Sequence, residues 1–123
     1  MWIFLKDEGF FSIVQNDKCK ADEVVVRARC RVDLDKLRAR LLADYVFDAK
    51  IIDTPDADYA CRLFAPKEII SKHLAQAVMD IDYGNFKATI PSKDRPRHDA
   101  YFGCWESMWQ WQGKLGRVGC KSV

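Results

Sequence analysis

Three arginines alternate with other residues at the end of a valine-rich stretch. Arg27, Arg29 and Arg31 are each two positions apart, and side chains at that spacing lie on one face of a β-strand. Arginine forks beside aromatic rings can hold phosphates while the rings stack on bases. The spacing therefore predicts a basic stripe on a sheet, which Arg62 joins if the strand register permits.

Aromatic residues that could stand beside this stripe lie nearby in sequence: Trp2, Phe4, Phe11 and Phe64. Two other interpretations stay open. The arginines form a solvated sheet face and pair with Glu23, Asp56 or Asp58, or an aromatic helix at the C-terminal end covers the face.

A second group of polar residues follows the middle of the chain: Asp80, Asp82, Tyr83, Asn85 and Lys87. Acid–base catalysis needs such groups close together in a pocket of low dielectric constant. The structural alternative is that Tyr83 and Phe86 anchor a helix end, while Asn85 caps backbone carbonyls.

The five cysteines, at positions 19, 30, 61, 104 and 120, include no Cys-x-x-Cys pair. Structural zinc sites normally contain such close ligand pairs, so we predict reduced thiols, no metal and no cofactor. A nucleophile from Cys61 or Cys104 with His73 or His98 is conceivable, but no feature of the sequence lowers a thiol pKa. His73 is most simply a core histidine.

Tryptophan is concentrated near the C-terminal end, at Trp105, Trp109 and Trp111. The periodicity predicts a helix over 97–112, with Tyr101, Trp105, Met108 and Trp109 on one face and Phe102 and Trp111 elsewhere. Such a helix is docked or belongs to an interface, and Trp, Tyr and Arg are enriched at binding hot spots.

The remaining elements are expected from apolar spacing. We predict strands over 2–5, 10–14, 23–31, 49–53 and 59–65, and helices over 34–45 and from Pro66 to Gly84. Four further details follow from local chemistry: a four-residue hairpin loop over 6–9 with a positive φ at Gly9, an N-cap at Asp33, Pro66 in a first helical turn, and a left-handed helix end at Gly84.

The predicted order is β-β-β-α-β-β-α-α, and its central part matches most of a ferredoxin-like split βαβ unit. We therefore expect an α+β two-layer sandwich, with a mainly antiparallel sheet and the helices on one face. Residues 1–112 are predicted to form one domain, residues 91–97 a loop, and residues 113–123 a flexible tail.

The bulk composition narrows the class of protein. The chain has 123 residues, a net charge of +2 and 49% hydrophobic residues, which excludes a disordered protein. Its apolar runs are too short to span a bilayer, and its charged opening is unlike a signal peptide. We expect a cytoplasmic protein without a membrane partner.

Several short motifs occur in one order: residues 1–4, 9–14, 26–29, 54–62 and 81–87, followed by Tyr101, Trp105 and Met108. With them, residues 1–109 resemble a family of small bacterial proteins that also occur on mobile elements. The family has no assigned activity, so the resemblance implies a stand-alone domain. It marks Arg27, Arg29, Asp58, Tyr59, Arg62, Tyr83, Asn85 and Lys87. Residues 113–123 depart from it.

The function expected from these patterns is that of a binding module rather than an enzyme. It would dock on a protein or nucleoprotein through the arginine face or the tryptophan-rich helix, for example as a phage-type, anti-CRISPR-like inhibitor of a host defence complex. Nucleic-acid or nucleotide binding by the arginine face is the first alternative, and a small enzyme of unknown reaction is the second. Homo-oligomerisation stays open.

Overall fold

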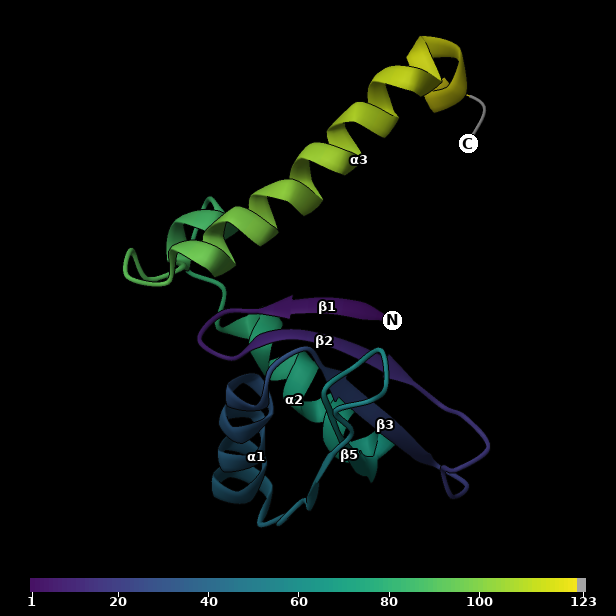
Figure 1. Cartoon of the computed structure of the whole chain (residues 1–123), viewed down its shortest axis with the longest axis vertical. Coiled ribbons are helices and arrows are strands. Elements are labelled where there is room, and N and C mark those ends of the chain that lie inside the picture. Colours follow the sequence, from purple (N-terminus) through teal and green to yellow (C-terminus); the bar gives the residue numbers. More distant parts are fainter. Residues whose placement is uncertain (122–123) are drawn as a thin grey trace. The chain divides into compact units, whose positions relative to one another are not determined.

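The computed structural model describes residues 1–121, and side chains up to residue 116. The chain forms two compact units, Met1–Asp82 and Tyr83–Val123, which are described separately (Figure 1). The predicted domain over 1–112 is not tested by this division and stays a prediction.

The first unit is built on a five-stranded sheet in the order β1-β2-β3-β5-β4, with every neighbouring pair antiparallel. Its elements are β1 (Trp2–Leu5), β2 (Gly9–Val14), β3 (Glu23–Ala28), α1 (Arg31–Tyr45), β4 (Ile51–Asp53), β5 (Cys61–Pro66) and α2 (Lys67–Met79). Because β5 lies between β3 and β4, the segment from β3 to α2 is the split unit that the sequence predicts. The α+β class with helices on one face is confirmed.

The core lies between one face of the sheet and the two helices. Val24, Val26 and Ala28 of β3 are buried on this face, as their alternation predicts. They belong to one cluster with the three buried leucines of α1 (Leu34, Leu37 and Leu41) and with Ile70 of α2. Removing this apolar area from water is the main stabilising term of the unit.

The third strand ends earlier than the sequence predicts. β3 stops at Ala28, and Arg31 is the first residue of α1, so Arg31 is not part of the basic stripe. Asp33 is also not the N-cap, because Cys30 occupies that position without a side-chain hydrogen bond. The buried Asp33 carboxylate instead accepts the N–H of Phe10 at 3.1 Å, which ties the first turn of α1 to β2.

The β1–β2 hairpin depends on a glycine. Leu5 pairs with Gly9, so the loop has three residues, Lys6 to Glu8, rather than the four predicted. Gly9 has the predicted positive φ, 151°. A Cβ at this position would lie 2.1 Å from Cγ of Asp33. Both the backbone conformation and the approach of the carboxylate therefore require glycine here.

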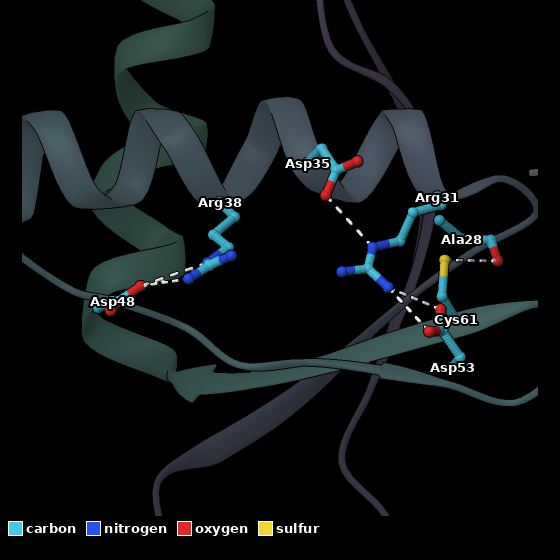
Figure 2. A network of polar contacts seen from close by, with 7 residues as sticks. All are labelled: Ala28, Arg31, Asp35, Arg38, Asp48, Asp53 and Cys61. Atoms are coloured by element: carbon cyan, nitrogen blue, oxygen red, sulfur yellow. Dashed lines mark hydrogen bonds and ion pairs between the residues drawn. The ribbon is translucent and has the colours of Figure 1, made fainter.

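Exposed ion pairs tie α1 to β4 and to the loop that precedes it. Figure 2 shows Arg31 between Asp35 and Asp53, with its Nη1 2.8 Å from an oxygen of Asp53. The hydrogen bond to Asp53, and then that to Asp35, raise the pKa of Arg31. Arg38 binds Asp48 at 2.9 Å. These contacts orient the helix, although exposed pairs add little free energy.

A buried polar pair joins the hairpin loop to α2. Nε2 of His73 lies 2.7 and 3.0 Å from the two carboxylate oxygens of Glu8, and both side chains are buried. His73 is a core histidine, as expected, but one with a carboxylate partner that the sequence pattern did not indicate. Its ring nitrogen is used in holding the loop against the helix.

The C-terminal half departs from prediction at several element ends. α2 ends at Met79, with Pro66 as its N-cap, and Gly84 is not among the residues with positive φ, so the predicted helix end at Gly84 is wrong. The second unit contains η1 (Phe86–Thr89) and α3 (Arg95–Lys121). α3 begins inside the predicted 91–97 loop.

The last helix continues past its predicted end at residue 112, with a non-helical backbone at Gly116 (φ 62°, ψ −171°). A glycine with positive φ breaks the helical hydrogen-bond pattern without steric cost. The flexibility expected for residues 113–123 stays a prediction, and its last two residues lie outside the described part.

We expect Gly9→Ala to destabilise the protein. The strained backbone alone should cost about 1–3 kcal/mol, and the Cβ would also displace the Asp33 carboxylate. The free energy of unfolding from urea denaturation measures the effect. Gly84→Ala is the matched control, because no atom lies within 4 Å of the added Cβ. Equal stability of the two variants would contradict the assigned role of Gly9.

We expect Glu8→Ala to lower the free energy of unfolding by about 1–3 kcal/mol, since it leaves the buried His73 imidazole without its partner. Glu8→Gln should lose less, because its amide oxygen can still accept a hydrogen bond. Thermal and urea denaturation would measure both variants. A Glu8→Ala protein as stable as the wild type would show that the pair is not stabilising.

Candidate functional site

The register of the sheet aligns a row of side chains across all five strands. The successive partners are Trp2, Ser12, Arg27, Arg62 and Ile52. Strand alternation places this row on the face opposite the core residues Val26 and Leu63. Arg27 and Arg62 are therefore direct neighbours, an arrangement of like charges that is destabilising unless something offsets it.

Tyr59 packs against two of the arginines. The guanidinium carbons of Arg27 and Arg29 lie 4.7 and 4.1 Å from the centre of its ring, and Tyr59 is only 4% exposed. The residue is held by its backbone, which donates to the Asp58 carboxylate at 3.0 Å and accepts from the Thr54 hydroxyl at 2.7 Å. The ring thus fixes both guanidinium groups by cation–π contact.

The hydrogen-bond acceptors of these arginines are mostly uncharged. Arg27 donates through Nη2 to the Ser12 hydroxyl at 2.7 Å, and Arg29 donates to the backbone carbonyl of Asp58. Arg62 donates to the Thr54 hydroxyl, and its Nη2 lies 3.6 Å from the Asp58 carboxylate. Nε of Arg27 is buried without a hydrogen-bond partner in the described part of the chain.

We call Arg27, Arg29, Asp58, Tyr59 and Arg62 the arginine cluster. Within the described residues Asp58 is the one carboxylate paired with its arginines, so the cluster has a formal excess of positive charge. The predicted pairing with Asp58 is confirmed for Arg62. Glu23 instead accepts a backbone N–H, that of Lys20.

The second unit has an aromatic surface along α3. Phe102 and Trp105 have ring centres 5.6 Å apart, and Trp105 stacks on Trp109 at 5.9 Å with nearly parallel planes. Met108 lies beside them by helical spacing and is also exposed. We call Phe102, Trp105, Met108 and Trp109 the aromatic face. Phe102, which the periodicity placed elsewhere, is part of it.

Two other residues singled out by the sequence are Lys87 and Trp111, of which only Lys87 contacts the aromatic face. Nζ of Lys87 is 5.0 Å from the centre of the Trp105 ring, so a cation covers part of that indole. Trp111 is exposed as well, but the two-residue step from Trp109 turns it by about 200° around the helix axis. Trp111 therefore lies on another side of α3.

The polar group at residues 80–87 does not form one site within either unit. In the first unit, Asp80 accepts a hydrogen bond from Gln76, and Asp82 binds Lys6 at 3.0 Å. In the second unit, Asn85 caps η1 by accepting the Lys87 N–H at 3.1 Å. The ring of Phe86 contacts Tyr83 and stacks on Tyr101. These contacts are structural, but their details differ from the predicted alternative, because Asn85 accepts a backbone N–H at the start of η1 instead of capping carbonyls at a helix end.

The first unit offers no activated thiol at Cys61. This thiol is buried and directed at the carbonyl of Ala28 at 3.8 Å (Figure 2). Burial raises the pKa of Cys61, which keeps it protonated and poorly nucleophilic. Among the described side chains, up to residue 116, no group of three or more potential ligands could hold a metal ion. Within residues 1–121 no helix is long and apolar enough to cross a membrane.

Comparisons with protein-family models, with curated proteins and with solved structures found no match. The resemblance to small bacterial proteins therefore stays a prediction.

The sequence pattern missed three residues that position these groups. Ser12 and Thr54 supply hydroxyls to Arg27 and Arg62, and Glu8 holds His73. A signal for Ser12 exists, since it is the one polar residue in the apolar strand 10–14. Thr54 and Glu8 lie in turn and loop sequences, where polar residues are ordinary.

Asp82 gives a prediction for pH dependence. The hydrogen bond from Lys6, and then the charge of Lys6, lower the pKa of Asp82. A carboxyl with a lower pKa in the folded state adds stability above its unfolded pKa, and this is lost as the pH falls through the folded pKa. We expect Lys6→Met to return the Asp82 pKa toward its usual value.

A carbon-13 NMR titration of the Asp82 carboxyl group measures this change. Lys72→Met is the control, because Lys72 pairs with Glu68. An Asp82 titration that is identical in Lys6→Met and the wild type would refute the assigned pairing.

Proposed function

We propose that the protein is a non-enzymatic binding module that docks on a partner protein through the aromatic face of α3. The observation that carries this proposal is the exposure of its four large apolar side chains. Phe102 is 43% exposed, Trp105 47%, Met108 58% and Trp109 59%. Large exposed apolar patches of this kind mark interaction sites on soluble domains.

The spacing of the aromatic face supports a particular mode of docking. Phe102, Trp105 and Trp109 occupy positions i, i+3 and i+7, the pattern by which a helix anchors its apolar side in a groove. Polar residues border the aromatic face along one side of the helix, at Asp99, Glu106, Gln110 and Lys114, since Glu106 lies one turn after Phe102. A fitting partner therefore presents an apolar groove with a polar rim.

Contacts within the second unit prepare this surface for binding. The stacking of Trp105 on Trp109 and the position of Lys87 over Trp105 restrict the rotamers of both indoles. Side chains that are already ordered lose less conformational entropy when they bind. Indole rings are also the side chains most enriched at binding hot spots.

The nature of the partner beyond this chemistry is a further proposal. A nucleoprotein defence complex, which an anti-CRISPR-like inhibitor would bind, is one candidate that the sequence suggests. No enzymatic role is proposed, since the described side chains at residues 80–87 and Cys61 serve structural contacts.

The test uses matched methionine variants. Met108 lies on the aromatic face and Met79 at the end of α2, and both are exposed. Tagged protein would capture its partner from nuclease-treated lysate of its host, and the partner's affinity would then be measured with purified components. Trp109→Ala should weaken binding by at least about tenfold, and Met108→Ala more than Met79→Ala.

Two results would contradict the proposal. One is capture that Trp109→Ala leaves unchanged, and the other is a partner that is captured from untreated lysate but not from the nuclease-treated lysate. Light scattering would also identify self-association, since a dimer that Trp109→Ala dissociates would make the aromatic face a contact between copies of this chain rather than a site for another protein.

A further inference from the structure

The arginine cluster brings positive charges together in a way that lowers the stability of the sheet and that the fold does not require. Arg27 and Arg62 face each other on adjacent strands, and within the described residues Asp58 is the one carboxylate that pairs with the three arginines. Like charges directly opposite each other lower the stability of a sheet. An apolar or oppositely charged pair would stabilise the sheet better, so the arrangement suits an anion from outside the unit.

The donors of the cluster match the geometry of a phosphate. Each guanidinium has five N–H donors in a planar fork, and in Arg29 a single hydrogen bond, to the Asp58 carbonyl, is formed among the described residues. Arg29 is exposed, and its position is fixed by Tyr59 at 4.1 Å. Planar forks held in place favour bidentate binding of phosphate oxygens.

The same row of the sheet also contains a stacking surface. Trp2 stands two strands from Arg27, beyond Ser12, and is 75% exposed. Its ring meets Phe10 edge-on at 6.4 Å, which leaves an indole face available. Adjacent strands are about 4.8 Å apart, so Trp2 and Arg27 lie about 10 Å apart, within reach of neighbouring nucleotides of one strand.

From these contacts we propose that the arginine cluster binds the phosphates of a single-stranded nucleic acid, with Trp2 as the platform for an unpaired base. Sheet faces with aromatic and basic residues bind unpaired bases by stacking and hold the backbone electrostatically. A duplex keeps its bases paired and stacked, so it would not offer a base to Trp2. DNA and RNA strands share this chemistry.

Asp58 tunes the site in this proposal. Its carboxylate is 68% exposed and 3.6 Å from Nη2 of Arg62, so it competes with an incoming phosphate for that guanidinium. Asp58→Asn removes the competing charge but retains an oxygen that can accept the Tyr59 N–H. This variant should therefore bind the nucleic acid more tightly than the wild type.

The experiment measures fluorescence anisotropy of labelled oligothymidylate and oligouridylate of about 12 nucleotides, titrated with the full chain at several salt concentrations. With Arg27, Arg29 and Arg62 contacting phosphates, log K against log salt should have a slope of about −2. Arg29→Gln should weaken binding several-fold and flatten the slope by about 0.7, and Trp2→Ala should weaken binding at all salt concentrations.

Arg40→Gln is the matched control, because Arg40 is an exposed arginine of α1 paired with Asp44. It removes the same charge outside the cluster and should leave binding unchanged. Each variant's urea denaturation midpoint would be compared with that of the wild type. Arg29→Lys keeps the charge on an exposed side chain and should bind more tightly than Arg29→Gln. A loss of affinity that is accompanied by a lower denaturation midpoint would be assigned to misfolding.

Three outcomes would overturn the proposal. They are no oligonucleotide binding at low salt, equal losses in Arg29→Gln and Arg40→Gln, and binding of pyrophosphate or ATP as tight as that of the oligonucleotides and insensitive to Trp2→Ala. A preference between the two oligonucleotides would identify the sugar. The proposed nucleic-acid site lies in the first unit, so Met108→Ala should leave oligonucleotide binding unchanged. The oligonucleotide test is therefore independent of docking by the aromatic face.

Discussion

The antiparallel pairing of β3 with β5 is the constraint on which the rest of the first unit depends. Its register places Val26 beside Leu63 on one face and Arg27 beside Arg62 on the other. The first pair belongs to the core that holds α1 and α2, and the second forms the centre of the arginine cluster. A register slip of one residue would exchange the two faces, so the core also fixes the site.

The contacts around Gly9 and His73 hold the hairpin of β1 and β2 to this pairing. The Asp33 carboxylate fits against a residue without a Cβ, and Glu8 reaches the imidazole of α2. The side chains of Asp33, Glu8 and His73 are all buried, where a polar group without a partner is costly. The position of Trp2 in the row with Ser12 and Arg27 therefore rests on contacts made by the loop of the hairpin.

In the second unit, some aromatic residues of α3 pack within the unit and others stay exposed. α3 packs its Tyr101 on Phe86 of η1, while the aromatic face stays exposed and is ordered by its own stacking. An amphipathic helix with this much exposed apolar area gains stability when a partner covers it. The two proposed sites use separate side chains. The arginine cluster and Trp2 belong to the first unit, and Trp105 and Trp109 belong to the second.

The sequence by itself determined the element order, the buried side of β3, the conformation of Gly9 and the apolar side of the last helix, because these follow from local periodicity and backbone sterics. It misplaced the end of β3, the cap at Asp33 and the end of α2, where long-range contacts override local preference. Only the tertiary structure decided that Arg27 meets Arg62, that Tyr59 packs against Arg27 and Arg29, and that Glu8 pairs with His73. Those partners come from separate segments, and strand register and the burial of polar groups, rather than spacing along the chain, bring them together.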